Sequence, residues 1–543
     1  MRPTTGANEH APGHRQPEET CAREAAMPVS QGTTAVRGTW CSEGEAGRHL
    51  RTKAGHAGGT PGGQETPSFV PISQRLERIA TQAREYPDMA FTTLAHHLDV
   101  AMLAHAFRSL NPQSAPGVDR VTWRTYKHHL ETNLETLYEK LVNGTYCPQP
   151  VVRRLIPTGG GKLRPLGLPA LEDKIVAKAV AMLMEAIYEQ DFCDFSYGFR
   201  RGRSPHQALQ EVRQGLLGGR IGSVIDCDIS SFFDNLQHDT LVAILRKRIN
   251  DGRVLEFIEL WLKAGILDGK EMVFPEKGSP QGSVISPLLA NVYLHEVLDT
   301  WFETVVRAHC RGKVVLYRYA DDFVIGCEWE EDARRIKEVL PKRFAKYGLE
   351  INTEKTKLVD FGRPQRSTPG RKPGTFSFLG FVHYWGKTWR GSYTIKRKTE
   401  GKRLRRTLGE FWRWCRDNRH RPLQEQYASL CAKLRGYYQY YGIRCNSQCL
   451  DLVYHTATRA WRYWLNRRGG RKMTWRAFGR MMAAYPLLRP RIVKGWVEGQ
   501  VGPYAHGTTG RRRAGVRTET EDAGCRRRRA TSPYGNVRCR GTV

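Results

Sequence analysis

Two adjacent carboxylates, Asp321 and Asp322, follow Tyr319 and Ala320 between the apolar runs VVLYRY and FVIGC. Two β-type runs separated by so short a stretch predict a tight hairpin with both acids at its tip. Neighbouring carboxylates repel each other and lose solvation, and hard oxygen ligands of this kind suit Mg²⁺. The alternative is an ordinary turn, because Asp is favoured in turns for local hydrogen bonding alone.

A third carboxylate lies upstream in the segment SVIDCDISSFFD, where Asp228 ends a short apolar strand. Acids on neighbouring strands can converge, and two-metal phosphoryl transfer needs shared ligands that stabilise both the attacking and the leaving oxygen. The sequence therefore predicts that Asp228, Asp321 and Asp322 bind two Mg²⁺ ions and are catalytic. Asp226 lies on the same strand face as Asp228 and is interpreted as a structural or solvated acid, and Asp234 as a local cap or ion-pair partner.

The charge of the chain indicates a polyanionic partner. Its 543 residues include 86 Lys plus Arg against 54 Asp plus Glu, which gives a formal net charge of +32. Such a charge attracts phosphate backbones, and the 13 Trp and 22 Tyr add rings that can stack on bases. Nucleic acid is therefore the predicted partner, and a basic protein without a nucleic-acid ligand is the alternative.

Cysteine usage and hydropathy predict where the protein works. The 13 cysteines show no paired spacing, which argues against a disulfide framework and indicates a reducing compartment. The chain has no apolar run of about 18 residues and no signal-peptide pattern at its start. We therefore expect a cytoplasmic protein without a membrane partner.

Three kinds of pattern surround the acids. Residues 89–110 and 126–141 have helical apolar spacing, and VVRRLIPTGGGKLRPLGLP after them predicts a basic hairpin with glycines at its tip. From 223 to about 381, β-type runs alternate with helical stretches, which predicts an α+β domain with an antiparallel sheet. From 397 to about 486, basic and aromatic-rich helical stretches replace the strands.

Several segments resemble one protein family. Asp228 with Phe233 is similar to polymerase motif A, and the tetrapeptide from Tyr319 to Asp322 is similar to motif C of reverse transcriptases. The segment KGSPQGSVISPLLANVYLHEVLD resembles group II intron-encoded reverse transcriptases over its whole length. GKLRPLGLP, FSYGFRRGRS, GLEINTEKTK and FSFLGF resemble further blocks of that family in the expected order. The resemblance extends from about residue 70 to about residue 492.

The resemblance implies a right-hand polymerase fold of the α+β class with an all-α thumb. The predicted units are a disordered arm (1–66), the N-terminal extension and fingers (67–222), the palm (223–395), the helical thumb or maturase domain (396–492) and a basic tail (493–543). The tail lacks the Cys and His ligand sets of the endonuclease found in many relatives, so we expect the bacterial type without that nuclease.

The resemblance also implies an activity and its partners. We expect an RNA-directed DNA polymerase that uses dNTPs on an RNA template with a DNA primer or target DNA. It would also act as a maturase that binds intron RNA during splicing and retrohoming. The alternatives are a splicing cofactor that makes little use of its polymerase site and a domesticated host reverse transcriptase without mobility.

Five residues are assigned to the dNTP pocket. Lys162 and Arg164 alternate onto one face of the hairpin and could hold the triphosphate, although a general RNA-contacting hairpin is the alternative. Phe233 would exclude a 2′-hydroxyl, or else belong to the core. Gln281 would face the nucleotide, and Lys355 resembles a lysine that protonates pyrophosphate. For both of these, an exposed and solvated side chain is the alternative.

The C-terminal helical region interleaves aromatic and basic residues and resembles the maturase domain of the family. Helical spacing predicts one apolar face for packing and one basic face for phosphates. Trp461, Trp464 and Trp475 could belong to either face, with the helix-bundle core as the alternative to RNA contact. The predicted RNA-binding residues are Arg200, Arg435, Arg459, Arg462, Arg467 and Arg468.

Overall fold

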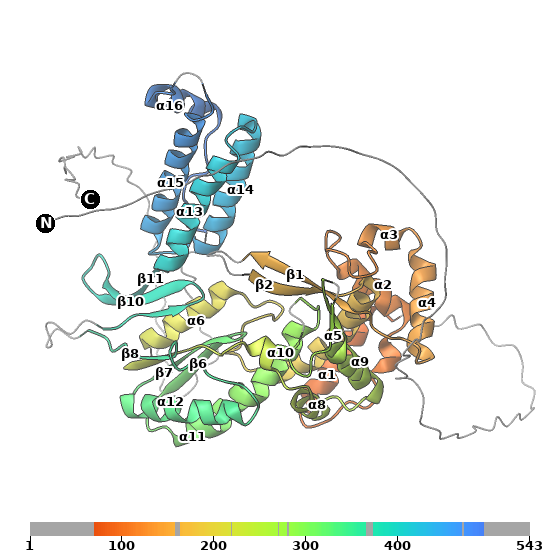
Figure 1. The fold of residues 1–543 in the computed structure, drawn as a ribbon. Coiled ribbons are helices and arrows are strands. Elements are labelled where there is room, and N and C mark those ends of the chain that lie inside the picture. The colour runs from red at the N-terminus through yellow and green to blue at the C-terminus, as the bar shows by residue number, and fades with distance from the viewer. Residues whose placement is uncertain are drawn as a thin grey trace, which may run out of the picture. The chain divides into compact units, whose positions relative to one another are not determined.

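The fold is taken from a computed structural model of the chain (Figure 1). The structure describes residues 70–157, 163–218, 220–269, 271–279, 282–364, 373–469 and 472–493. The predicted N-terminal arm, and the predicted tail beyond Val493, lie outside the described residues. Among the described residues, no helix combines the length and apolar composition needed to span a membrane.

The N-terminal helices pack around helix α5 (Leu171–Asp191), which is buried on most of its circumference. A helix with buried residues around most of its circumference belongs in a core, and α5 contacts both α1 and α2. Asp99 caps α2, because its side chain accepts a hydrogen bond from the Met102 amide at 2.8 Å. The helices of this part are α1 (Ile72–Glu85), a 3₁₀ turn η1 (Ala95–His97), α2 (Val100–Ser109), α3 (Trp123–Lys127) and α4 (Leu130–Val142).

A four-stranded sheet in the order β2-β1-β4-β5 follows. Its strands are β1 (Val151–Pro157), β2 (Leu163–Leu168), β4 (Ile266–Asp268) and β5 (Glu271–Val273). β1 pairs antiparallel with β2 and parallel with β4. The two predicted strands of the basic hairpin are therefore confirmed, while its glycine tip lies outside the described residues.

A second antiparallel sheet, with the order β6-β7-β3-β8, is called the central sheet below. Its strands are β3 (Ser223–Cys227), β6 (Val314–Tyr319), β7 (Asp322–Cys327) and β8 (Lys357–Asp360). Alternate residues enter different cores: Ile225 packs in the cluster that contains α12 (Glu330–Ala345), and Val224 packs in the cluster that contains α6 (Pro205–Gly218). The sheet is thus covered on both faces, and the predicted antiparallel sheet is confirmed.

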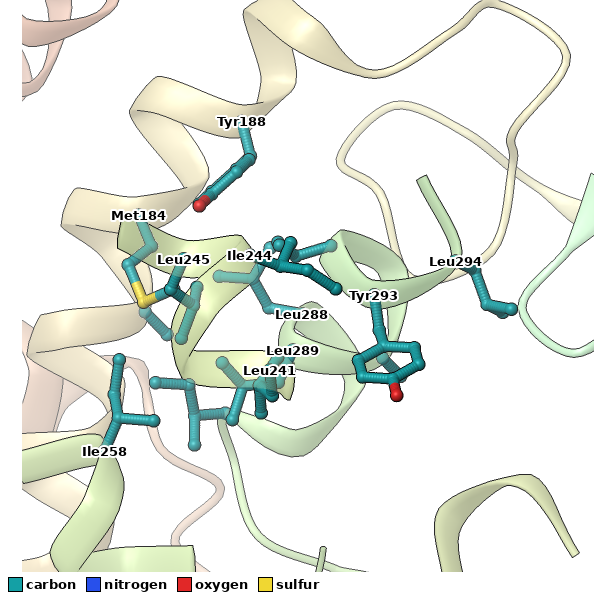
Figure 2. Packing of buried hydrophobic residues seen from close by; sticks show 14 of the residues in the cluster. Met184, Tyr188, Leu241, Ile244, Leu245, Ile258, Leu288, Leu289, Tyr293 and Leu294 are labelled. Atoms are coloured by element: carbon teal, nitrogen blue, oxygen red, sulfur yellow. The ribbon is translucent and has the colours of Figure 1, made fainter. Parts of the chain in front are cut away.

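The main core lies where α5 meets the helices that connect the strands. Figure 2 shows Met184 of α5, Leu245 of α8 and Leu288 of α10 in one apolar cluster. The connecting helices are α7 (Phe232–Asn235), α8 (His238–Arg246), α9 (Gly252–Lys263), α10 (Ser286–Leu294), the π-helical turns η2 (His295–Thr300) and η3 (Phe302–Val306), and α11 (Arg307–His309). π-Helical turns are uncommon and are frequent near functional sites.

A three-stranded antiparallel sheet leads into the last helices, which we call the C-terminal bundle. The strands are β9 (Phe376–Phe378), β10 (Phe381–Lys387) and β11 (Tyr393–Thr399); the bundle consists of α13 (Gly401–Asp417), α14 (Leu423–Tyr441), α15 (Ser447–Leu465) and α16 (Trp475–Ala484). The predicted start of the helical region at residue 396 is wrong, because β11 stays paired with β10 as far as Thr399.

Candidate active site

The three predicted catalytic acids lie at one end of the central sheet. The β6–β7 turn carries Asp321, and Asp322 is the first residue of β7. β3 pairs with β7 so that Cys227 faces Phe323, and extending this register by one residue sets Asp228 opposite Asp322. The fold therefore brings together, from two adjacent strands, the carboxylates that the sequence singles out.

The surroundings of Asp321 and Asp322 raise the pKa values of these two acids. Desolvation by neighbouring protein atoms is the main cause: it raises the pKa of Asp321, with a further contribution from the charge of Asp228. It raises the pKa of Asp322 to about 7, with contributions from Asp226 and Asp321. The pKa of Asp226 itself rises to about 6, again mainly because of burial. A divalent cation would relieve this crowding of negative charge.

The donor chemistry of the site fits Mg²⁺, because carboxylate oxygens are the hard ligands that this ion prefers. Within the described ranges, however, no group of three acidic, His or Cys side chains is closed into a metal-binding arrangement. Two of the acids have protein partners instead. Asp228 accepts a hydrogen bond from the Lys355 ammonium at 2.8 Å, and Asp322 accepts one from the Leu379 amide at 3.3 Å.

A buried ion pair beneath the β6–β7 turn was not predicted from the sequence. Arg318 and Asp299 have side chains that are 0% exposed, and the Arg318 Nε donates to Asp299 Oδ1 at 2.8 Å. Burial alone would raise the pKa of Asp299, but the charge and hydrogen bonds of Arg318, together with His295, lower it below its usual value. Arg318 and Asp299 therefore form a buried salt bridge directly behind the turn that carries Asp321.

This ion pair also fixes the shape of the turn. Arg318 Nη1 donates to the Ala320 carbonyl at 3.3 Å and to Asn291 Oδ1 at 3.0 Å. Ala320 has φ of 55°, a left-handed conformation that is costly for a residue with a side chain. The backbone at Gly198 is so close that an added Cβ would lie 2.3 Å from the Ala320 amide nitrogen. Arg318, Asn291 and Gly198 therefore clamp the turn from behind.

The predicted dNTP-binding residues are only partly described. Arg164 lies near enough to Asp321 for its charge to act against the raised pKa of that acid. Phe233 is half-buried and lines a cavity of about 140 Å³ between the β1–β2 hairpin and the loop at Gly278. Lys162 and Gln281 lie outside the described residues.

Lys355 lies directly at the site. In addition to its 2.8 Å contact with Asp228, its loop is tied to the same strand end, since the Asn352 amide donates to the Asp228 carbonyl at 2.8 Å. Its side chain remains 65% exposed, so the ammonium group is accessible from the site. The structure thus places Lys355 beside an acid rather than in an isolated solvated position.

The prediction that Arg200 binds RNA is wrong. Its side chain is 3% exposed and its guanidinium bonds to Glu189, at 3.0 Å from Nη2, and to the carbonyls of Cys193 and Ser196, at 2.8 and 2.9 Å. The guanidinium nitrogens of Arg200 thus donate hydrogen bonds within the protein and hold the loop that leads to Gly198. No feature of the run FRRGR distinguishes this arginine from its exposed neighbour Arg201.

The arginines of the C-terminal bundle divide into two groups. Arg462 stacks over Trp475 at 3.9 Å and donates to the Met473 carbonyl at 3.1 Å, while Arg468 donates to the carbonyls of residues 420 and 421. Both are half-buried and brace the connections between helices. The exposed members of the predicted set are Arg435, Arg459 and Arg467.

The three tryptophans of the C-terminal bundle differ in how far they are exposed to solvent. Trp461 is 0% exposed and donates to Gln426 Oε1 at 2.9 Å, so it belongs to the core, as the alternative interpretation had it. Trp464 is half-buried. Trp475 is 58% exposed and supports Arg462 on its ring. Trp475 is therefore the most exposed of the three.

Comparison with known proteins gives the class to which the chain belongs. The family model described as reverse transcriptase (RNA-dependent DNA polymerase) matches residues 156–383, which include all three acids. Protein YkfC of Escherichia coli (strain K12) is 37% identical over 322 residues, covering 53% of this chain and 84% of that protein. These matches define the class of the protein as a reverse transcriptase.

Two further relatives identify the group within this class. The group II intron-encoded protein LtrA of Lactococcus lactis subsp. cremoris is 31% identical over 400 residues, covering 62% of this chain and 63% of LtrA. Nuclear intron maturase 1, mitochondrial, of Arabidopsis thaliana is 32% identical over 95 residues, covering 18% of this chain and 13% of that protein. The chain belongs to the group II intron reverse transcriptase/maturase family, and the resemblance found in its motifs is confirmed.

Proposed function

We propose that this protein copies RNA into DNA by two-metal phosphoryl transfer at Asp228, Asp321 and Asp322. The central sheet would be the palm, the β1–β2 hairpin part of the fingers, and the C-terminal bundle the thumb. The observation that carries the proposal is the register of β3 against β7, which sets Asp228 opposite Asp322 beside the clamped turn that carries Asp321. Bound Mg²⁺ would supply positive charge for the attacking 3′-hydroxyl and the leaving pyrophosphate.

The residues around the acids have separate tasks in this proposal. Arg164, together with Lys162, binds the triphosphate, and Phe233 excludes a 2′-hydroxyl from the sugar site. Lys355 holds the charge of Asp228 while the site is empty, and it protonates pyrophosphate once a nucleotide is present. The ammonium group of Lys355 lies beside Asp228 and is exposed, which supports both roles, as a partner of Asp228 and as a proton donor to pyrophosphate. Gln281 contacts the nucleotide from the loop that precedes α10.

A second role, as a maturase, rests on charge and on the relatives. The net charge is +32, and Arg435, Arg459 and Arg467 present exposed guanidinium groups on the bundle. LtrA is a group II intron-encoded protein by name. We propose intron RNA as the partner of the bundle, and a cytoplasmic location, where the nine free cysteines of the described residues would remain reduced.

Primer extension on an RNA template, with and without Mg²⁺, tests the catalytic proposal. Asp321→Ala and Asp228→Ala should each abolish extension while RNA binding stays nearly intact, because the acids act on transition-state charge rather than on RNA affinity. Asp239→Ala, which removes an exposed acid in the first turn of α8, is the matched control and should extend normally. Extension by Asp321→Ala at the wild-type rate would overturn the assignment.

A further inference from the structure

Leu379 links the C-terminal bundle to one of the catalytic acids, Asp322, by two hydrogen bonds. The Tyr440 hydroxyl, on α14, donates to the carbonyl oxygen of Leu379 at 2.9 Å. The amide of the same Leu379 donates to Asp322 Oδ2 at 3.3 Å. A tyrosine of the bundle and a carboxylate of the central sheet are thus joined by the two peptide groups of one residue.

Leu379 has a backbone conformation that needs support. Its φ is 50°, and the next residue, Gly380, has φ of 77°. A left-handed conformation in a residue with a side chain is costly and persists only where its surroundings enforce it. The Leu379 peptide would therefore reorient readily if its hydrogen-bond partners were removed.

Residues of the C-terminal bundle, and the residue just before it, contact the turn at Leu379 and Gly380 at several points. The Glu400 amide, just before α13, donates to the Gly380 carbonyl at 3.0 Å. A Cβ added at Gly380 would lie 2.9 Å from Arg403 Cδ and 3.2 Å from the Tyr441 hydroxyl. A side chain at residue 380 would therefore meet side chains of α13 and α14, so the turn lies directly against the bundle.

Tyr440 is itself held in place and keeps its proton. Its ring lies 5.8 Å from that of Phe381 at an angle of 25°, and its backbone carbonyl accepts a hydrogen bond from His206 Nε2 at 2.8 Å. Burial raises the pKa of Tyr440 to about 12. At neutral pH the hydroxyl is therefore a hydrogen-bond donor in a fixed position.

We propose that Tyr440 is a positioning residue for polymerisation: through the Leu379 peptide it fixes the carboxylate of Asp322 and makes the active geometry depend on a seated bundle. The inference rests on the proposed polymerase function and adds a dependence that the acids alone do not have. A bundle displaced from the turn would leave Asp322 without its fixed donor, and the site would bind its metal ions less well.

The test is the Mg²⁺ dependence of single-turnover primer extension by Tyr440→Phe, together with the Mg²⁺ affinity of its primer–template complex measured by titration calorimetry in the absence of dNTP. This change keeps the ring and removes one hydrogen bond, so the half-saturating Mg²⁺ concentration should rise about three- to tenfold. The affinity for primer–template should stay the same, and high Mg²⁺ should recover part of the rate. Tyr437→Phe is the matched control, because that hydroxyl contacts Thr399 Oγ1 at 3.3 Å and not Leu379.

Each outcome separates this inference from the function on which it rests. If wild type extends primers and Tyr440→Phe has the same Mg²⁺ dependence as Tyr437→Phe, only the positioning role is overturned, whatever happens to the melting temperature. If wild type does not extend primers, or Asp321→Ala does, the polymerase proposal itself fails. Should Tyr440→Phe not fold, His206→Ala decides, since it removes the side chain bonded to the Tyr440 carbonyl oxygen at 2.8 Å, frees the same tyrosine and should also raise the Mg²⁺ requirement.

Discussion

The central sheet and the C-terminal bundle differ in how they arrange side chains of like charge. The sheet crowds carboxylates at one end, where desolvation raises the pKa values of Asp226, Asp321 and Asp322. The bundle spreads its arginines over several helices and leaves Arg435, Arg459 and Arg467 exposed to solvent. Crowded and desolvated charge destabilises a fold unless it is compensated, whereas dispersed surface charge costs little.

The two regions also use their arginines differently. Arg318 lies behind the acids, fully buried, with Asp299 as its partner and the Ala320 carbonyl as a further acceptor. The bundle instead uses Arg462 and Arg468 to bind its own carbonyl groups. Substitutions in the sheet should therefore change stability and catalysis together, and those of exposed bundle arginines should change RNA binding alone.

The largest effect is expected from Arg318→Met. It leaves Asp299 buried without a counter-charge, which should lower the free energy of unfolding by about 3–5 kcal/mol. Urea unfolding measures this loss. The double variant Arg318→Met/Asp299→Leu should regain most of the stability but not primer extension, because the Ala320 carbonyl still lacks its donor. Full stability in the single variant would contradict the role given to the pair.

A smaller effect is expected from the bundle. The combined variant Arg435→Ala, Arg459→Ala and Arg467→Ala should flatten the dependence of log K for intron RNA on log salt by roughly 0.7–0.9 per lost phosphate contact. Its melting temperature should not change. Arg462→Ala is the control: it should lower the melting temperature, because it loses the Met473 bond and the Trp475 stack. An unchanged salt slope in the combined variant would remove these arginines from the RNA interface.

The smallest effect concerns the sugar site beside the acids. Phe233→Ala should reduce the preference for dNTPs over rNTPs by about tenfold, equivalent to about 1.4 kcal/mol, since it removes a clash rather than a contact. Single-turnover incorporation of each nucleotide measures the ratio. If the ratio is the same as in wild type, Phe233 is only a packing partner of Phe232, whose ring lies 5.3 Å away.

The convergence of the acids could be predicted because strand ends and tight turns are local features of the sequence. A hairpin between VVLYRY and FVIGC must have Asp321 and Asp322 at its turn. If the strand that ends at Asp228 pairs antiparallel with this hairpin, Asp228 lies at the same end of the sheet. The central sheet was therefore predicted correctly. The division of roles among residues of one type could not be predicted, as Arg200 shows: its burial depends on Glu189 and on two carbonyl groups of a folded loop.

The clamp behind the turn was missed for a similar reason. Asp299 and Arg318 belong to a π-helical turn and a strand, and only tertiary packing brings Asn291 and Gly198 to them. A charged residue inside the apolar run VVLYRY was the one signal available. The link from Tyr440 to Asp322 left no signal, because it passes through the backbone of Leu379.

We propose that the central sheet carries out polymerisation and that the C-terminal bundle binds intron RNA. One experiment tests it directly: primer extension on an unrelated RNA template, run beside intron splicing at low Mg²⁺, for Asp321→Ala and for the combined Arg435, Arg459 and Arg467 alanine variant. We predict that the aspartate variant loses extension and still splices, and that the arginine variant extends primers and loses splicing at near-physiological salt. Loss of splicing in the aspartate variant, or normal splicing by the arginine variant, would contradict the division of labour.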